Sequence, residues 1–457
     1  MRRLVSAAAL VAAVMVLPWV ARAGNFGGRF SAVGGISIDA SGVVRTASLA
    51  DRHALLEELR QRVAEPAGQL ADAAELRMVS LRGLQAAIQA ATEQGKPLPD
   101  EVRFLAGLQR IRYVFVYPER NDIVLAGPAE PWVIRDDATV VGKLSGRPVL
   151  LLDDLVVALQ AAFSPEHQGM QCSIEPTAEG YQQVNQLLGE FARRNPGADP
   201  RQLDVALREA FGPQQVKLAG IPQDSHFARV MVAADYQMKR YAMDLEPAPI
   251  DSLPSYLDMA SGPEGVSGSN PRWWMACNYD ALQRSENRLA WQISGQGVKT
   301  LTETDLIDAA GNVQRTGKSE PTARRWAETM TKQFDALSER AAIFGELRNA
   351  MDLALVAALI HDERLADIAG CNLQPIVGDQ GQTVSASAYT PVSFEVPKAV
   401  EPQCSFLKKR KGWMVTASGG VEINPYAVLQ QQTVSTELDQ VRSRGMANPA
   451  DQWWWNG

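Results

Sequence analysis

The chain has 457 residues, of which 46% are hydrophobic and 21% are charged, and its formal net charge is −7. A chain of this length can bury a sizeable core and is expected to form about two or three domains. Removal of the first 23 residues, which contain three arginines, would lower the charge from −7 to −10. Nucleic acid is therefore disfavoured as a partner of the whole molecule, because its phosphates repel an acidic surface.

The first 23 residues have the pattern of an export signal. Two arginines open the chain, residues 4–20 are largely apolar apart from Pro18, and Ala21-Arg22-Ala23 forms a small-x-small ending before Gly24. Pro18 shortens the apolar run below the about 20 residues that a membrane anchor requires, and no later segment is long enough. We expect cleavage between Ala23 and Gly24, no retained anchor, and a periplasmic or extracellular location.

Residues 24–246 are expected to form an α+β domain with a mixed sheet, hairpins and packed helices. Asp39-Ala40-Ser41-Gly42 predicts the turn of a first hairpin, and alternating apolar and aromatic residues over 111–117 begin the clearest one. Strands and helices alternate from residue 148 onward. The expected N-caps of helices are Ser80, Asp153, Thr177 and Ser225.

Residues 247–270, which are rich in Pro, Gly and Ser, are interpreted as a linker or a long surface loop. A second, smaller α+β unit is expected over residues 271–430, with hairpins and a long helical region over residues 321–367. Residues 431–457 are expected to form a polar C-terminal tail.

Three consecutive tryptophans near the C-terminus, Trp453, Trp454 and Trp455, are the binding candidates. Tryptophan is over-represented among residues that anchor interfaces, and the polar tail has little else to bury. The triplet predicts docking to a partner or to another part of the chain, and the alternative is a loosely ordered tail. By contrast, Trp273-Trp274 is expected to lie in the core.

Export also bears on whether the four well-separated cysteines form disulfides. They are Cys172, Cys277, Cys371 and Cys404. In an oxidising compartment such cysteines are typical of disulfides, and four allow three pairings. Cys371 with Cys404 is preferred because the two are nearest in sequence. Cys172 has another interpretation, since it alternates with Met170 and Ile174 along an expected strand and would then face a core.

Several short patterns resemble catalytic motifs but lack their companions. Ser405-Phe406-Leu407-Lys408 matches the S-x-x-K of penicillin-recognising enzymes, yet no S-D-N or K-T-G element follows. Asp224-Ser225-His226 has the residue types of a triad, but consecutive side chains point apart and Asp and Ser are typical caps. Gly317-Lys318-Ser319 lacks the first glycine of a phosphate loop, because Asn312 stands in its place.

Acidic residues offer a second hydrolase interpretation. Asp136-Asp137 and Asp153-Asp154 could serve glycoside hydrolysis if two carboxylates lay about 5 to 10 Å apart in a cleft, but capping and solvation are preferred. Asp352 interrupts an apolar helix four residues after Arg348, which predicts an ion pair between them. The four histidines have no metal-ligand spacing, so we expect neither a metal nor another cofactor.

Four longer motifs carry a family resemblance. They are Arg103-Phe104-Leu105-Ala106-Gly107, the segment from Tyr113-Val114-Phe115-Val116-Tyr117 to Pro118-Glu119-Arg120-Asn121-Asp122, Gly127-Pro128-Ala129-Glu130-Pro131-Trp132, and Pro271-Arg272-Trp273-Trp274. With them, most of the mature chain resembles a family of bacterial exported proteins known only as a domain of unknown function. The resemblance implies export and a shared fold, and it carries no activity, cofactor or catalytic residue.

The sequence thus assigns no biochemical activity. The leading hypothesis is a non-enzymatic envelope or secreted protein that binds another macromolecule, such as an envelope protein or polymer, or serves as a structural module. The basic run Lys408-Lys409-Arg410-Lys411 could meet a polyanion there, although a solvated run is preferred. The alternative is an extracytoplasmic hydrolase whose site is assembled from distant residues. A cleft holding Ser405, Lys408 and a second base, or two facing carboxylates, would favour the hydrolase.

Overall fold

The computed structural model describes residues 33–166, 169–195, 199–260, 270–308, 310–378, 389–407, 412–415, 418–446 and 452–457. The expected export signal over residues 1–23, its cleavage point at Ala23 and Gly24, and the basic run over residues 408–411 lie outside this part of the chain.

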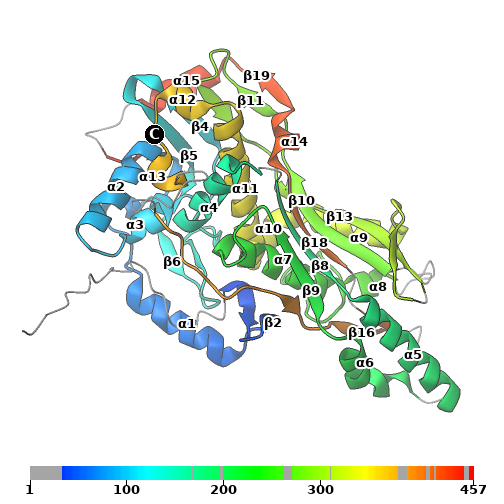
Figure 1. The fold of residues 1–457 in the computed structure, drawn as a ribbon. Helices are drawn as coiled ribbons and strands as arrows, with labels where there is room; N and C mark the ends of the chain where they lie inside the picture. The colour runs from blue at the N-terminus through cyan, green and yellow to red at the C-terminus, as the bar shows by residue number, and fades with distance from the viewer. Residues whose placement is uncertain are drawn as a thin grey trace, which may run out of the picture.

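Two large mixed sheets with helices packed around them form the described molecule (Figure 1). In the larger sheet, β10 pairs in parallel with β18 and antiparallel with β13, so parallel and antiparallel ladders meet on one strand. Among the described residues this sheet has nine strands, in the order β1 (Ile36–Ile38), β2 (Val43–Thr46), β15 (Ala399–Val400), β9 (Gln214–Ala219), β8 (Met170–Glu175), β18 (Gly419–Ile423), β10 (Asn270–Asn278), β13 (Gly297–Ile307) and β14 (Val313–Arg315).

The smaller sheet contains the predicted hairpin of alternating apolar and aromatic residues, which forms β4 and β5. Within the described ranges its seven strands follow the order β19 (Gln432–Val434), β11 (Leu282–Arg284), β12 (Ala290–Gln292), β4 (Tyr113–Tyr117), β5 (Asp122–Ala129), β3 (Ala74–Ser80) and β20 (Trp454–Asn456). Two separate hairpins pair β6 (Trp132–Ile134) with β7 (Val140–Gly142) and β16 (Cys404–Leu407) with β17 (Gly412–Val415).

The helices start where the sequence supplies caps. Ser80 Oγ accepts a hydrogen bond from the Gly83 N–H at 2.8 Å, and Ser225 Oγ accepts one from the Ala228 N–H at 3.1 Å. The helices are α1 (Leu49–Arg62), α2 (Leu81–Glu93), α3 (Asp100–Arg103), α4 (Leu152–Phe163), α5 (Ala178–Arg194), α6 (Asp204–Phe211), α7 (His226–Ala242), α8 (Tyr256–Ala260), α9 (Pro321–Lys332), α10 (Phe334–Arg340), α11 (Ala342–Asp362), α12 (Leu365–Ala369), α13 (Gln374–Val377), α14 (Pro425–Leu429) and α15 (Leu438–Gly445). Short 3₁₀ turns occupy Val33–Gly35, Gly68–Ala71, Leu105–Gly107, Pro118–Arg120 and Pro200–Leu203.

The apolar helix α11 lies at the centre of the fold. It is buried along almost its whole length and packs against α4, α7 and α10, as expected of a helix that is apolar on nearly every side. The predicted long helical region over residues 321–367 is therefore present, divided into α9, α10, α11 and the start of α12. Mixed sheets combined with these packed helices confirm the expected α+β fold.

The two units expected from the sequence share one core. Both large sheets contain strands from residues 24–246 and from residues 271–430, and one cluster of buried apolar side chains includes Leu125 and Val298. Residues 247–270 contain α8, whose Tyr256 packs edge-on against Trp273. The expected boundaries therefore do not coincide with a division of the sheets or of the core, because strand pairing joins segments that are distant in sequence.

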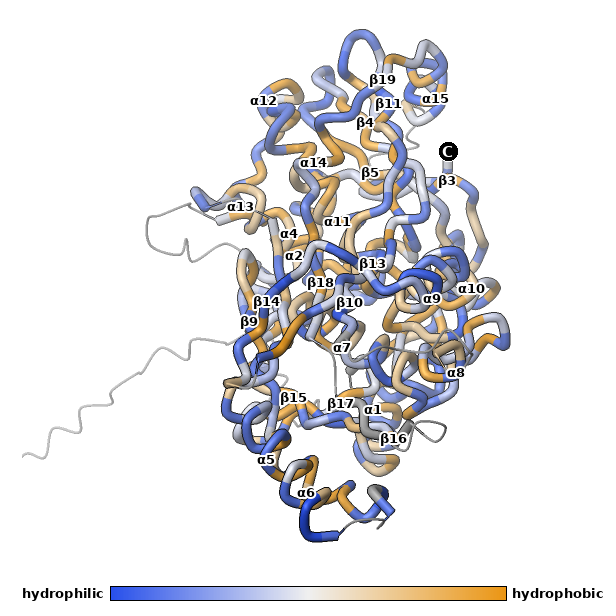
Figure 2. The backbone as a smooth tube through the Cα atoms, turned by 90° about the vertical axis from the view of Figure 1, so that its right-hand side faces the viewer, coloured by the Kyte–Doolittle hydropathy of each residue, from blue (hydrophilic) through white to orange (hydrophobic). Residues whose placement is uncertain are grey.

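Among the described helices, α7, α9 and α11 pack against one face of the larger sheet. On that face α7 contacts β8, β18 and β10, while α9 and α11 contact β13. The strands β18, β10 and β13 cross the middle of Figure 2, with α14 above them. Along β8 the residues alternate between buried and partly exposed, so that Met170, Cys172 and Ile174 face the core. The opposite face is the open face of the sheet, and it carries the other half of each strand's side chains.

Helices α5 and α6 project from one end of the molecule (Figures 1 and 2). They are connected to the sheet through β8 and β9, which pair with each other antiparallel. Val184, Leu203, Leu207 and Phe211 form a small apolar cluster between the two helices, separate from the main core. The projection is thus an insertion between two neighbouring strands with its own packing.

Candidate functional site

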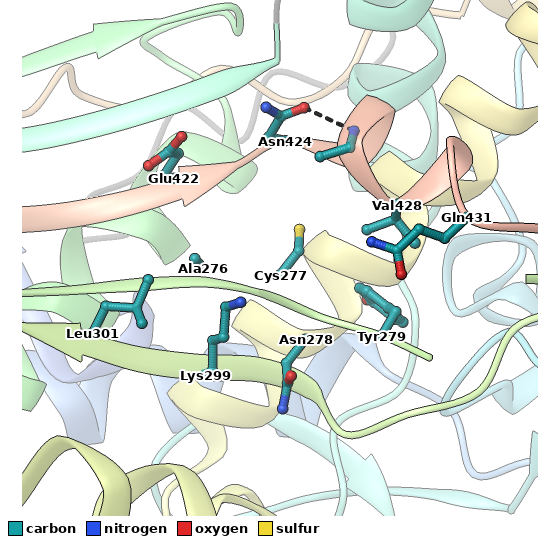
Figure 3. Close-up of a pocket in the computed structure, with 11 residues that line it drawn as sticks. Ala276, Cys277, Asn278, Tyr279, Lys299, Leu301, Glu422, Asn424, Val428 and Gln431 are labelled. Atoms are coloured by element: carbon teal, nitrogen blue, oxygen red, sulfur yellow. Dashed lines mark hydrogen bonds between the residues drawn. The ribbon is translucent and has the colours of Figure 1, made fainter. Parts of the chain in front are cut away.

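A pocket of about 310 Å³ opens on the open face of the larger sheet, between strands β18, β10 and β13 and helix α14 (Figure 3). Its size is at the lower end of the about 300–1,000 Å³ that ligand pockets occupy, which suits a small molecule or a short segment of a larger one. The pocket is lined by Ala276, Cys277, Asn278, Tyr279, Lys299, Leu301, Glu422, Asn424, Ala427, Val428 and Gln431.

Strand register places opposite charges on the two sides of Ala276. Ala276 is paired with Lys299 on β13 and with Glu422 on β18, and Figure 3 shows its short side chain between the two charged ones. Because neighbouring strands lie about 4.8 Å apart, the Cα atoms of Lys299 and Glu422 are separated by about 10 Å. Within the described part of the chain, neither charged group has an ion-pair partner within 4.0 Å. We call these three residues the charged row.

The inner end of the pocket is held by a buried ion pair. Tyr279 donates its hydroxyl hydrogen to Asp352 Oδ1 at 2.7 Å, and Arg110 donates to the same carboxylate through Nε at 2.8 Å and Nη2 at 2.7 Å. Burial disfavours the ionised carboxylate, but the Arg110 guanidinium outweighs it and keeps the pKa of Asp352 below its usual value. The predicted partner Arg348 instead bonds Asp335 at 2.8 Å, so the expected pairing within α11 was wrong.

Cys277 adds a neutral group to the pocket rather than a reactive one. Burial raises the pKa of its thiol to about 12, although the backbone N–H of Asn424 donates a hydrogen bond to it. The thiolate is the nucleophilic form of cysteine, and at such a pKa it is scarce near neutral pH. The charges that face the pocket therefore come from Lys299 and Glu422.

The aspartate pair on α4 lies elsewhere, in a buried polar cluster under the segment over residues 389–398. Asp154 accepts hydrogen bonds from His226 Nδ1 at 3.1 and 3.0 Å. Burial disfavours a charged imidazole, but Asp154 outweighs it and raises the pKa of His226 to about 9. Asp153 accepts from the Tyr389 hydroxyl at 2.5 Å. Each carboxylate thus has its own partner, and the two do not face each other across a cleft; the expected capping role of Asp153 was also wrong.

The other acidic pair lies at the surface of a turn. Asp137 accepts hydrogen bonds from the Thr139 N–H at 3.1 Å and from Arg135 Nε at 2.9 Å. The Asp136 side chain is 94% exposed and contacts Arg60 at 3.2 Å. Turn formation and solvation account for both residues, as the sequence suggested.

The serine motifs are engaged in structural hydrogen bonds. Ser405 Oγ donates to the Met243 carbonyl at 2.5 Å, and Lys408 lies outside the described residues. Ser225 caps α7, while Asp224 accepts from Ser393 Oγ at 2.6 Å. The described geometry therefore assembles no hydroxyl nucleophile with a base from these motifs.

The terminal tryptophans dock onto their own chain. Trp454 and Trp455 pair with Val79 and Met78 of β3, and only 2% of Trp455 is exposed. This places the triplet at the edge of the smaller sheet, so Trp455 is not an exposed anchor. Trp273 is fully buried as expected, whereas Trp274 is partly exposed on the open face, with Arg272 4.9 Å from its ring centroid.

All four cysteines are free thiols, so the expected disulfides, including the preferred Cys371–Cys404 pair, are not formed. Cys371 follows α12, which packs on β4 and β5, whereas Cys404 begins β16, which packs on α6. Nearness in sequence did not translate into nearness in space, because the chain crosses the molecule between them. Cys172 faces the core from β8, as its alternation with apolar neighbours indicated.

Neither a membrane-spanning helix nor a metal-binding cluster of acidic, His and Cys side chains occurs among the described residues. In these residues, none of the helices has both the length and the apolar content that crossing a bilayer requires. Across the same ranges, His, Cys, Asp and Glu side chains form no group of three or more that could hold a metal ion.

Neither the charged row nor the His226–Asp154 pair was expected from the sequence. Lys299 and Glu422 are more than a hundred residues apart, and only the shared neighbour β10 brings them together. Lys299 is partly exposed and Glu422 is exposed, and each by itself is an ordinary charge on a strand.

Comparison with known proteins identifies one part of the chain. Residues 172–256 match a family described as "Protein of unknown function (DUF1598)", and they extend from β8 through α5, α6, β9 and α7 to the start of α8. No curated protein and no solved structure matches the chain. The matched segment includes His226 but none of the residues that line the pocket. The chain is thus similar, over this segment, to a family of proteins of unknown function.

Proposed function

We propose that this protein is a non-enzymatic binding protein that is exported from a bacterial cell, and that the pocket on the open face holds part of a macromolecular partner. The observation that carries the proposal is the charged row, in which Lys299 and Glu422 flank a small floor residue and neither has an ion-pair partner among the residues that the structure describes. Charged groups left available in a concave site fix the orientation of a ligand.

The export part of the proposal rests on the first 23 residues alone. Their basic start, apolar run and Ala21-Arg22-Ala23 ending are typical of a cleaved signal, which would deliver the chain to the periplasm or the medium. Expression of the full chain in a bacterial host, followed by fractionation and mass measurement of the N-terminus, tests this. A chain that begins at Gly24 outside the cytoplasm is expected, whereas an uncleaved cytoplasmic chain would contradict it.

A hydrolase is the weaker proposal. Ser405 is committed to a backbone carbonyl, and burial keeps the Cys277 thiol protonated. The His226–Asp154 pair has the residue types of a catalytic dyad, but its side chains are only 8% and 7% exposed. A general base must reach the proton that it abstracts from a substrate. The geometry therefore supports binding better than hydrolysis.

Affinity capture from an envelope extract tests the binding proposal. The mature protein, residues 24–457, is compared with a Lys299→Met/Glu422→Gln double variant that keeps the size of both side chains while removing their charges. We expect the partner retained by the unaltered protein to be depleted from the variant eluate, as measured by quantitative mass spectrometry. Lys217→Met, an exposed charge on β9 outside the pocket, is the matched control and should retain the partner. Equal retention by all three proteins would contradict the proposal.

A further inference from the structure

We infer that the group recognised by the pocket is a zwitterionic peptide: a short stretch of polypeptide that presents a free ammonium group and a free carboxylate close together. This inference rests on the proposed function, and it names the chemistry of the partner. The carboxylate would lie against Lys299 and the ammonium group against Glu422, so the bound segment would run across the strands rather than along them.

The spacing of the charged row suits a ligand of this length. The Cα atoms of Lys299 and Glu422 lie about 10 Å apart, and both residues flank the small side chain of Ala276. A chain advances by at most about 3.3–3.6 Å for each residue, so a dipeptide carries its terminal charges about 5–6 Å apart. The pocket volume of about 310 Å³ accommodates a ligand of that size but not a folded domain.

The remaining lining suits a peptide bond and a small apolar side chain. Asn424 Oδ1 accepts a hydrogen bond from the Ala427 N–H at 3.2 Å, which leaves its amino group able to donate to a ligand carbonyl. Gln431 offers both a donor and an acceptor at the opposite end of the pocket in Figure 3. Leu301 and Val428 supply apolar contacts at the edge.

Apart from Lys299 and Glu422, the charged groups around the pocket neutralise each other. Tyr279 has already donated its hydroxyl hydrogen to Asp352, and Arg110 neutralises that carboxylate beneath the pocket. A ligand with only negative charge would be repelled by Glu422, and one with only positive charge would be repelled by Lys299. A zwitterion satisfies both side chains, which distinguishes it from a polyanion or a polycation.

Calorimetric titration with capped dipeptides tests the inference directly. The probes are Ala-Leu, N-acetyl-Ala-Leu, which lacks the ammonium group, and Ala-Leu-amide, which lacks the carboxylate. Ala-Leu is expected to bind the mature protein tightest, and each cap should weaken binding by about two- to fivefold, as for an exposed ion pair. In a variant that lacks one of the two charged side chains, capping the ligand group that this side chain would bind should cause no further loss of affinity.

The same three probes are titrated into the single variants. In Lys299→Met, Ala-Leu and Ala-Leu-amide should bind equally; in Glu422→Gln, Ala-Leu and N-acetyl-Ala-Leu should bind equally; and Lys217→Met should behave as the unaltered protein. Equal binding of all three probes to the unaltered protein, or no binding of any, would overturn the inference. If capture of the macromolecule still depends on Lys299 and Glu422 in that event, the proposed function stands and only the zwitterionic chemistry fails; if capture is also unaffected, both fail.

Discussion

The charged row and the buried polar cluster differ in the burial of their ionisable side chains and in the partners of these side chains. On the open face, Lys299 is partly exposed, Glu422 is exposed, and no described residue forms an ion pair with either. Under residues 389–398, His226 is only 7% exposed and is bound by Asp154, while Asp153 is bound by Tyr389. Water can solvate the first pair of charges, but only the protein can satisfy the second group.

This difference separates groups that hold the fold from groups that are available to a ligand. A buried charge is tolerated only with a partner, so the partners in the cluster are part of the stability of the molecule. An exposed charge has no such requirement, and its removal costs the fold little. The contrast therefore indicates a structural role for His226, whereas Lys299 and Glu422 are exposed enough to meet the proposed ligand.

The structural role of the cluster extends along the covering segment. Ser393 donates to Asp224 at 2.6 Å, the Phe394 ring lies 6.0 Å from the His226 ring, and Glu395 contacts Arg229 at 3.3 Å. The segment then enters β15, which pairs with both β2 and β9. The cluster thus anchors the strand that joins the N-terminal hairpin to the rest of the larger sheet.

The largest expected effect comes from breaking the buried pair. Asp154→Ala would leave the His226 imidazole buried without its carboxylate, which should lower the free energy of unfolding by about 3–5 kcal/mol. Urea denaturation followed by circular dichroism measures the loss. Asp136→Ala, which removes an aspartate whose side chain is 94% exposed, is the control and should leave stability unchanged. Equal effects of the two substitutions would show that the cluster is not structural.

The cluster also predicts that stability falls as pH rises. The pKa of His226 is raised from 6.5 to about 9, so its stabilising contribution is complete below about pH 6.5 and is lost as the pH rises through about 9. Burial raises the pKa of Glu346 to about 7, which acts in the same direction between about pH 4.5 and 7. The shift of His226 corresponds to about 3 kcal/mol.

Denaturation at a series of pH values between 5 and 9.5 checks this dependence. His226→Gln should flatten the curve between about pH 6.5 and 9, because the titrating group is removed. The Lys299→Met/Glu422→Gln variant should leave the curve unchanged, since no buried titration is altered. A curve that is flat in the unaltered protein, or that rises with pH over this range, would refute the assignment.

The smallest effect on stability, but a clear effect on binding, is expected from filling the floor of the pocket. Ala276→Leu would place a larger side chain between Lys299 and Glu422 and occupy the space that the dipeptide needs. Calorimetry should show at least a tenfold loss of Ala-Leu affinity, with an unfolding free energy within about 1 kcal/mol of the unaltered protein. Undiminished affinity would place the ligand elsewhere.

Several local signals in the sequence predicted local structure correctly, although the capping role expected of Asp153 was wrong. Turn residues and alternation identified the β4–β5 hairpin, and Ser80 and Ser225 marked the starts of helices. Contacts between distant segments had no such signal. Asp352 lies four residues from Arg348, which made their pairing the obvious expectation, yet Arg110 reaches it from 242 residues away. The charged row depends in the same way on which strands become neighbours, and strand order is not encoded locally.

Exchange of the charges at Lys299 and Glu422 tests whether opposite charges on the two sides of Ala276 bind the peptide. Lys299→Glu alone makes both ends of the charged row acidic, and Ala-Leu binding should be lost. Addition of Glu422→Lys restores a row of opposite charges in reverse order, and binding should return because a dipeptide can enter in the opposite direction. The account predicts this loss and recovery in calorimetry at an unchanged melting temperature. Equal binding by the unaltered, singly and doubly exchanged proteins would contradict it.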